Sequence, residues 1–269
     1  MLELLGNQLE LLARSLREVL STHMNATGRL NNEILHGKKL ADEGAADIWN
    51  WSGPVGNARA ERRTKYLTEI GRIHATDNVL EIGCGTGIFT RKLYDATKAR
   101  ITGIDISEDL LEIARESTSA KDLSFVRDNA MSMSFPDETF DVVVGSSVLH
   151  HLDFETSLKE IFRVLKKGGR MMFGEPNMLN PQIFIQKNVP FIKKWAGDSP
   201  DETAIVRWSL AKQMRSTGFT SIKIFPYDFL HPATPAFLIP FVDAVGRTLE
   251  QIPILREIAG SVIIYGEKQ

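Results

Sequence analysis

The sequence predicts an α/β protein with a doubly wound, mostly parallel seven-stranded sheet that carries helices on both faces. Between residues 79 and 174, short apolar segments alternate with amphipathic ones, an order that produces a parallel sheet with right-handed crossovers. Residues 142–144 and 171–173 are continuous apolar runs, which are typical of central strands covered on both faces. A glycine-rich turn after the first strand is the third observation that favours this fold.

Residues 1–55 are expected to form an N-terminal helical cap on a main domain that spans residues 56–269. Apolar residues at three- and four-residue spacing predict an amphipathic helix over residues 2–20. We expect that helix to dock on the main domain or on a second subunit, with weak membrane-surface contact as the alternative. Charged residues within the same stretch argue against a secretory signal peptide.

The main domain is expected to contain seven strands and five helices. The predicted strands are residues 79–82, 101–106, 123–127, 140–145, 170–174, 221–225 and 261–265. The predicted helices are residues 56–74, 88–97, 108–117, 154–165 and 202–217. Two apolar insertions, at about 177–200 and 226–259, are too long for plain connections. They are expected to form a lid or cleft for an apolar ligand, with self-packing and a homodimer interface as open alternatives.

Three alternate glycines, Gly83, Gly85 and Gly87, follow the first predicted strand and precede a helix. Glycine allows positive φ and lets a ligand approach where a Cβ would obstruct it. The free N–H groups of the following helix then face the ligand. The pattern therefore predicts half of a nucleotide-type site at the carboxyl end of a strand. Cys84, the single cysteine, lies in this loop and is expected to be a buried filler.

Four further residues stand where a bound adenosine would need them, at the carboxyl ends of predicted strands: Asp105, Ile106, Asp128 and Asn129. Asp105 could accept both ribose hydroxyls, and Ile106 could pack on a purine face. Each aspartate could instead serve only to cap a turn. A dinucleotide site would also place an acid about 20 residues on, but it prefers G-x-G-x-x-G to the G-x-G-x-G spacing found here.

Several motifs in order resemble the class I S-adenosylmethionine-dependent methyltransferases, in particular the group called methyltransferase type 11. The resemblance is carried by residues 79–90, 101–107, 127–130, 135–152 and 164–177, and is strongest over 81–87, 135–143 and 163–169. It implies a Rossmann-like fold and an enzyme that uses S-adenosyl-L-methionine and releases S-adenosyl-L-homocysteine. The resemblance is much weaker for the N-terminal 55 residues and the two insertions.

The resemblance also implies which residues bind the cofactor. They are Glu81, Gly83, Gly85, Gly87, Asp105, Ile106, Asp128, Asn129, Ala130 and Ser146, with Trp51 and Arg59 placed more loosely upstream. Glu81 would hold the amino group, directly or through water. Glu81 could instead serve only to shape the loop, and Ser146 could be an ordinary polar residue at the end of a strand.

Methyl transfer needs alignment and dry packing of two reactants, and a hydroxyl or acidic carbon acceptor also needs a base. His150 and His151 follow the fourth strand, and an imidazole whose pKa is near neutrality suits that role. Substrate shaping or packing is the alternative for both. Glu175 and Asn177 are candidates for contact with the acceptor, or else for binding loop N–H groups. No metal site is predicted, because no third ligand is evident from the spacing.

Composition limits the function classes that remain. A net charge of −2 gives no reason to expect a nucleic-acid partner, and no apolar run approaches the length of a membrane span. We expect a cytoplasmic enzyme acting on a small molecule. The apolar insertions favour an acceptor that is apolar or quinone-, lipid- or polyketide-like, and methylation at oxygen is the favoured reaction. The rivals are a nicotinamide-dependent oxidoreductase on the same sheet and a non-catalytic protein that binds the cofactor as a partner of another enzyme.

Overall fold

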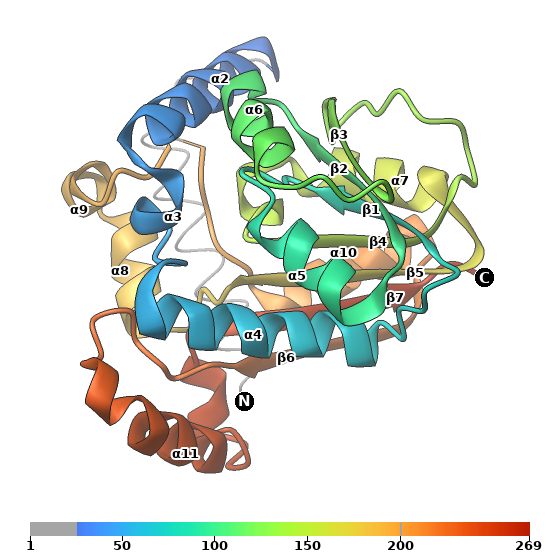
Figure 1. Ribbon diagram of the computed structural model, residues 1–269. Coiled ribbons are helices and arrows are strands. Elements are labelled where there is room, and N and C mark those ends of the chain that lie inside the picture. The colour runs from blue at the N-terminus through green and yellow to red at the C-terminus, as the bar shows by residue number, and fades with distance from the viewer. Residues whose placement is uncertain (1–25, 200) are drawn as a thin grey trace.

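The computed structural model describes residues 26–199 and 201–269. The helix predicted over residues 2–20, with its docking seam, lies outside the described residues. Within residues 26–77, three helices precede the sheet: α2 (Ala26–Glu43), α3 (Ala45–Ile48) and α4 (Gly53–Ile70). Figure 1 shows α2 and α3 at one end of the molecule, whereas α4 runs along the sheet.

All seven predicted strands form, in one sheet of order β3-β2-β1-β4-β5-β7-β6. Their bounds are β1 (Asn78–Ile82), β2 (Arg100–Asp105), β3 (Leu123–Arg127), β4 (Phe140–Ser146), β5 (Leu165–Pro176), β6 (Thr220–Tyr227) and β7 (Ser261–Glu267). The pairs from β3 to β5 are parallel, and β7 runs antiparallel to both β5 and β6. The predicted mostly parallel, doubly wound sheet is therefore confirmed.

Helices cover both faces of this sheet. In Figure 1, α4 and α5 (Ile88–Thr97) lie in front of the strands, and α7 (Phe154–Val164) and α10 (Arg207–Thr217) lie behind them. Val142 and Val144 pack into the front core with Leu67 and Leu93, whereas Val143 packs into the rear core with Leu158. Residues of a single apolar run thus pack into two cores, because successive side chains of a strand point to opposite faces.

Local capping explains where two helices begin. Ser107 precedes α6 (Glu108–Glu116), and its side chain accepts a hydrogen bond from the backbone N–H of Leu110. Asp153 precedes α7, and its carboxylate accepts from the N–H of Thr156. These side chains satisfy donors that the first helical turn leaves unpaired. Because α6 begins so soon after β2, the chain turns away from the edge of the sheet directly after Asp105.

The first insertion contains α8 (Pro181–Asn188) and α9 (Pro190–Trp195), and it continues further than expected. The helix predicted over residues 202–217 begins only at Arg207, so its first turn was predicted wrongly. Residues 203–206 are extended, and Ile205 forms a parallel bridge with Asn177 beyond β5. Burial of Ile205 between the insertion and the sheet overrides the local helical pattern.

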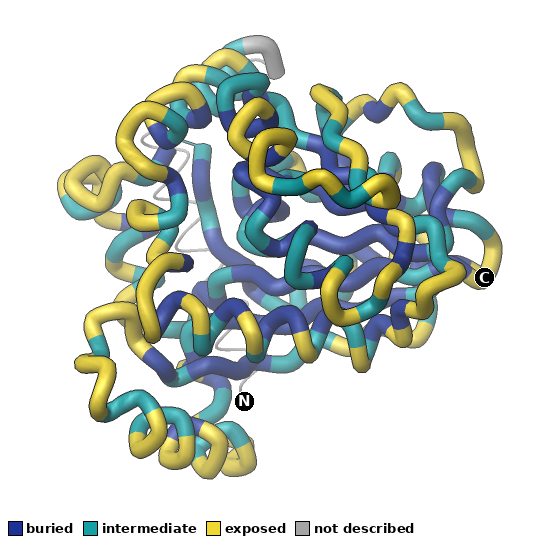
Figure 2. The backbone as a smooth tube through the Cα atoms, viewed as in Figure 1, coloured by how far each residue is buried: buried dark blue, intermediate teal, exposed yellow. Residues whose placement is uncertain are grey.

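The second insertion contains η2 (Ala236–Leu238), α11 (Ile239–Leu249) and η3 (Leu255–Ile258). Large apolar side chains remain exposed on both insertions, among them Phe191, Trp195, Phe237 and Phe241. Figure 2 shows this part of the molecule as predominantly exposed. Within the described part of the chain, no helix combines the length and the apolar character that a bilayer crossing requires.

Candidate functional site

A cavity of about 530 Å³ opens at the carboxyl ends of the central strands. One side is formed by the ends of β1, β2, β3 and β4, with Gly83, Asp105, Asp128 and Ser146 on the wall. The opposite side is formed by α2, α3 and both insertions. This edge of a doubly wound sheet is where ligands of such proteins bind.

In the glycine loop after β1, two neighbouring side chains approach the backbone closely. Gly83 and Gly85 have φ values of 66° and 51°, a region that residues with a Cβ rarely adopt. A Cβ on Gly83 would lie 2.3 Å from the Cγ2 atom of Val148, and one on Gly85 would lie 2.7 Å from the Trp49 ring. Gly87 instead precedes α5 and is not on the cavity wall, so its place is to turn the chain into the helix.

Asp105 joins the glycine loop to the end of β2. Its Oδ2 accepts from the Gly85 N–H at 2.9 Å, and its Oδ1 accepts from the Ser107 N–H at 3.0 Å. Burial raises the pKa of this carboxyl, and the backbone N–H donors oppose that shift. Asp105 and Ile106 both line the cavity, as the sequence predicts.

Asp128, Asn129 and Ala130 lie together on the same wall. The Asp128 carboxylate accepts from the Asn129 N–H and, at 2.9 Å each, from the N–H and hydroxyl of Ser134. Asp128 therefore stabilises the turn that follows β3, the alternative that the sequence left open. The turn still presents all three residues to the cavity.

Glu81 is buried behind the glycine loop rather than on the cavity wall. Its Oε2 atom has no hydrogen-bond partner among the described residues. Burial raises the pKa of the Glu81 carboxyl to about 8. A buried acid with one unpaired oxygen is costly once it ionises, unless a positive group approaches it.

We expect Glu81 to make the ligand-free protein less stable as pH rises. The folded protein keeps this proton up to about pH 8, whereas the unfolded chain releases it near pH 4.5, so the unfolded state binds fewer protons within that window. The contribution of Glu81 to the free energy of unfolding should fall by about 2–5 kcal/mol across the window and stay level above it. Urea unfolding of wild type and Glu81→Gln at pH 5 and pH 8 measures it. Equal pH dependence of the two proteins would contradict this expectation.

Two arginines of α4 face the cavity with different partners. Arg59 pairs with Asp228 at 3.0 Å and lies over the Trp51 ring. Arg63, only 2% exposed, donates to Ser146, Ser147, Ser261, Tyr227 and the Gly174 carbonyl. No carboxylate among the described residues lies within ion-pair distance of Arg63. Of the two, only Arg59 is predicted from the sequence as a cofactor residue; Arg63 stands one helical turn further along α4.

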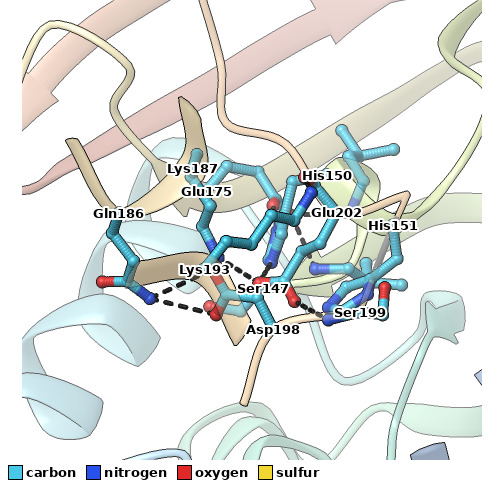
Figure 3. A network of polar contacts seen from close by, with 12 residues as sticks. Ser147, His150, His151, Glu175, Gln186, Lys187, Lys193, Asp198, Ser199 and Glu202 are labelled. Atoms are coloured by element: carbon cyan, nitrogen blue, oxygen red, sulfur yellow. Dashed lines mark hydrogen bonds and ion pairs between the residues drawn. The ribbon is translucent and has the colours of Figure 1, made fainter. Parts of the chain in front are cut away.

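His150 is buried between two acids, as Figure 3 shows. Its Nδ1 lies 2.7 Å from Glu175 Oε2, and its Nε2 lies 3.3 Å from Glu202 Oε1. Burial disfavours the charged ring, but the two carboxylates outweigh it and raise the His150 pKa to about 9. The expectation of a near-neutral pKa is therefore wrong for His150, which holds its proton at neutral pH and is poorly suited to act as a base.

His151 is the more accessible histidine, with a side chain 20% exposed on the cavity wall. Its Nδ1 lies 3.1 Å from Glu33 Oε2, a residue of α2. The ring of His36, also from α2, lies 6.4 Å away between centroids. Both predicted histidines line the cavity, and His151 is the more exposed of the two.

Glu175 and Asn177 are not on the cavity wall, so the predicted acceptor contacts need correction. Glu175 is fully buried and accepts from the N–H groups of Val148 and Leu149 as well as from His150. Asn177 is 1% exposed and donates to two carbonyls near η3. Both residues satisfy the backbone polar groups of loops that surround the cavity.

The structure adds acidic and basic residues that the sequence analysis did not connect with the histidines. Glu202 and Lys187 come from the first insertion and pair with each other, and Lys187 also contacts Asp198 at 2.9 Å. His150, His151 and Glu202 bring one ligand atom each within 4.8 Å of one another. The third potential metal ligand, which the sequence spacing could not reveal, is thus present. No local signal marks Glu202, because 51 residues separate it from His151.

The chain resembles known methyltransferases in sequence. Residues 80–173 match a family model described as a methyltransferase domain. A demethylmenaquinone methyltransferase from Lactococcus lactis is 32% identical over 184 residues, which are 60% of this chain and 72% of that protein. Another, from Alkalihalophilus pseudofirmus, is 31% identical over 180 residues, with coverage of 58% and 75%.

Solved structures share the fold. A SAM-dependent methyltransferase from Thermotoga maritima aligns with a TM-score of 0.60 at 21% identity, over 87% of this chain and 100% of that one. The geranyl diphosphate C-methyltransferase of Streptomyces coelicolor, solved with Mg²⁺, geranyl diphosphate and S-adenosyl-L-homocysteine, aligns with a TM-score of 0.55 at 18% identity over 79% of each chain. The sequence relatives and the methyltransferase-domain match, on a sheet of this order, show that the protein is an enzyme belonging to the class I S-adenosylmethionine-dependent methyltransferases.

Proposed function

We propose that this enzyme methylates a small quinone-like or otherwise apolar acceptor, at a hydroxyl oxygen rather than at carbon or nitrogen. The proposal depends on one observation. The strand ends form one wall of the cavity, and the two insertions contribute to the opposite wall. Two reactants held between these walls can be aligned, and the walls keep part of the surrounding water away from them. The relatives named demethylmenaquinone methyltransferases support a quinone-type acceptor.

The strand-end wall suits the cofactor, whose sulfonium supplies the methyl group. We assign the ribose hydroxyls to Asp105, the adenine to Ile106 and residues 128–130, and the amino group to Glu81. The unpaired Glu81 oxygen favours a nearby ammonium, which it would reach through water because Glu81 lies behind the glycine loop rather than on the cavity wall. Arg63, buried without a carboxylate partner among the described residues, is assigned to the cofactor carboxylate.

The insertion wall is assigned to the acceptor. It combines apolar side chains such as Leu30, Ile48 and Ile183 with the polar group formed by His151 and Glu33. An apolar wall with a few placed polar groups is the usual form of a small-molecule site. Ring carbons would contact the apolar part, and the hydroxyl would be oriented toward His151.

The acceptor class can be tested with methyl-labelled S-adenosylmethionine and the purified full chain. A short-chain demethylated naphthoquinol, a simple catechol and a primary amine are supplied separately, and mass spectrometry with NMR locates the label. We expect labelled ether formation on an aromatic hydroxyl, with one S-adenosylhomocysteine per methyl group. Transfer to the amine alone would contradict the proposed acceptor class, and transfer to a ring carbon would contradict the oxygen preference.

Replacing His151 should separate turnover from cofactor binding. We expect His151→Ala to lower kcat by about 10- to 100-fold, because an acceptor hydroxyl loses its polar partner, while the affinity for S-adenosylmethionine is unchanged. His150→Ala should instead lower the melting temperature, because it leaves Glu175 and Glu202 facing each other without a cation between them. His74→Ala, at an exposed position remote from the cavity wall, is the control. Full turnover by His151→Ala would remove this histidine from the reaction.

A further inference from the structure

We propose that His150, His151 and Glu202 bind a divalent transition-metal cation at the acceptor end of the cavity. Each residue offers one ligand atom, and these atoms all lie within 4.8 Å of one another. Two of these atoms, His150 Nε2 and Glu202 Oε1, are 3.3 Å apart. Ligand atoms about 2.0–2.1 Å from a tetrahedral zinc ion stand roughly 3.3 Å from each other.

The donor set favours one class of cation. Two imidazoles and one carboxylate suit Zn²⁺, Fe²⁺ or Co²⁺, whereas Mg²⁺ and Ca²⁺ prefer sites made of oxygen. Two histidines with one glutamate also leave coordination positions open, as catalytic zinc sites do. Glu33 Oε2, 3.1 Å from His151 Nδ1, is a partner of the His151 ring rather than a member of the ligand group.

The residues around the cluster resemble the outer shell of a metal site. The Nδ1 atom of His150 contacts Glu175 at 2.7 Å, which leaves Nε2 directed at Glu202. A cation would bind in place of the proton that Nε2 carries in the metal-free protein, and that proton would be released to solvent. Glu175 is itself held by the N–H groups of Val148 and Leu149. Metal-binding histidines commonly use their second ring nitrogen in this way, which fixes both the orientation of the ring and its tautomer. The ring of His150 is thus oriented by the core and does not depend on the metal.

Lys187 is the competitor for this position, because its ammonium pairs with Glu202 Oε1. The same ammonium also lies 2.9 Å from Asp198 Oδ2, so it keeps a carboxylate partner when Glu202 turns toward a cation. Figure 3 shows Lys187, Asp198 and Glu202 converging from the first insertion on the histidines. Binding of a cation would therefore exchange one Lys187 contact for a bond between the insertion and η1 (Leu149–His151).

The role of the cation deepens the proposed function and depends on it. The histidine side of the cluster borders the cavity, so an open coordination position would face the acceptor. A bound cation would hold a hydroxyl oxygen there and favour its ionised form. Acceptors with two neighbouring oxygens, such as catechols and hydroxyquinones, would gain most, because both oxygens can reach the same ion. His151 would then act through the metal rather than as a free base.

Cobalt(II) provides a test that does not require turnover. The chelator-treated full chain is titrated with Co²⁺ alone, and visible absorption reports coordination by nitrogen and oxygen ligands. We expect one Co²⁺ per chain, displaced by one equivalent of Zn²⁺, and an affinity at least about 10-fold lower in Glu202→Gln. His74→Asn should bind as wild type does. Circular dichroism confirms that each variant is folded, and His151→Asn provides a second ligand substitution.

Two results would overturn the site: absence of a saturable visible band, or equal Co²⁺ affinity in wild type, Glu202→Gln and His151→Asn. Methyl transfer is measured in parallel with and without chelator. Transfer that persists in chelator, together with saturable Co²⁺ binding, would leave the site standing and remove its role in the reaction. Saturable binding without transfer to any supplied acceptor would count against the proposed function and not against the site.

Discussion

Asp105→Ala is expected to weaken the binding of S-adenosylmethionine by at least about 100-fold. The carboxylate at the end of β2 is assigned to both ribose hydroxyls, and each hydrogen bond to a charged group contributes about 1.5–3 kcal/mol. Its present partners, the N–H groups of Gly85 and Ser107, also keep the glycine loop in place. Calorimetric titration with S-adenosylmethionine and S-adenosylhomocysteine measures the effect.

Asp122→Ala is the matched control, because Asp122 is an exposed acid immediately before β3, at the opposite end of the sheet. It should bind the cofactor as wild type does. Asp105→Asn keeps the size of the side chain and should fall between the two. An affinity for Asp105→Ala within threefold of wild type, in a protein with normal circular dichroism, would remove Asp105 from the site.

Arg63→Lys is expected to weaken cofactor binding by about 10- to 100-fold. The guanidinium is buried, donates to several hydroxyls and a carbonyl, and has no carboxylate partner in the described part of the chain. The five N–H donors of a guanidinium can keep these partners and still offer one hydrogen of Nη2 to the cofactor carboxylate, whereas the three donors of a lysine ammonium cannot. Calorimetry again measures the affinity.

The comparison ligand is 5′-methylthioadenosine, which lacks the amino-acid part of the cofactor. Arg63→Lys should bind it as wild type does, because Arg63 is assigned only to the carboxylate. Arg62→Lys is the matched control, since Arg62 pairs with Glu250 away from the cavity wall. It should lose stability without losing affinity. If Arg63→Lys loses the same affinity for both ligands, its role is to support the structure.

Much of the fold could be predicted because its signals are local. Each signal depends on neighbours within a few residues. This holds for the apolar pattern of a strand, for the cap of a helix and for a glycine turn. The exception in the fold, residues 203–206, is extended because Ile205 is buried against the end of β5. No local sequence pattern predicts that these two segments pair.

The strand-end wall of the site was predictable for the same reason. Parallel strands end at one edge of the sheet, so Asp105 and Asp128 could be placed together before the structure was known. The choice between Arg59 and Arg63 could not be made, because it depends on Asp228, a residue of the second insertion. Asp228 engages Arg59 and leaves Arg63 without an acid.

The sheet, the class of enzyme and the edge at which the cofactor residues gather could all be predicted from the amino-acid sequence, since they follow from periodicity and from motifs within short stretches. The raised pKa of His150, the burial of Glu175 and the proximity of His151 to Glu33 and Glu202 became apparent in the folded chain alone. The physical reason is that a side chain's pKa and accessibility depend on groups within a few ångströms in space. In this protein those groups come from α2, β5 and the first insertion, tens of residues away along the chain.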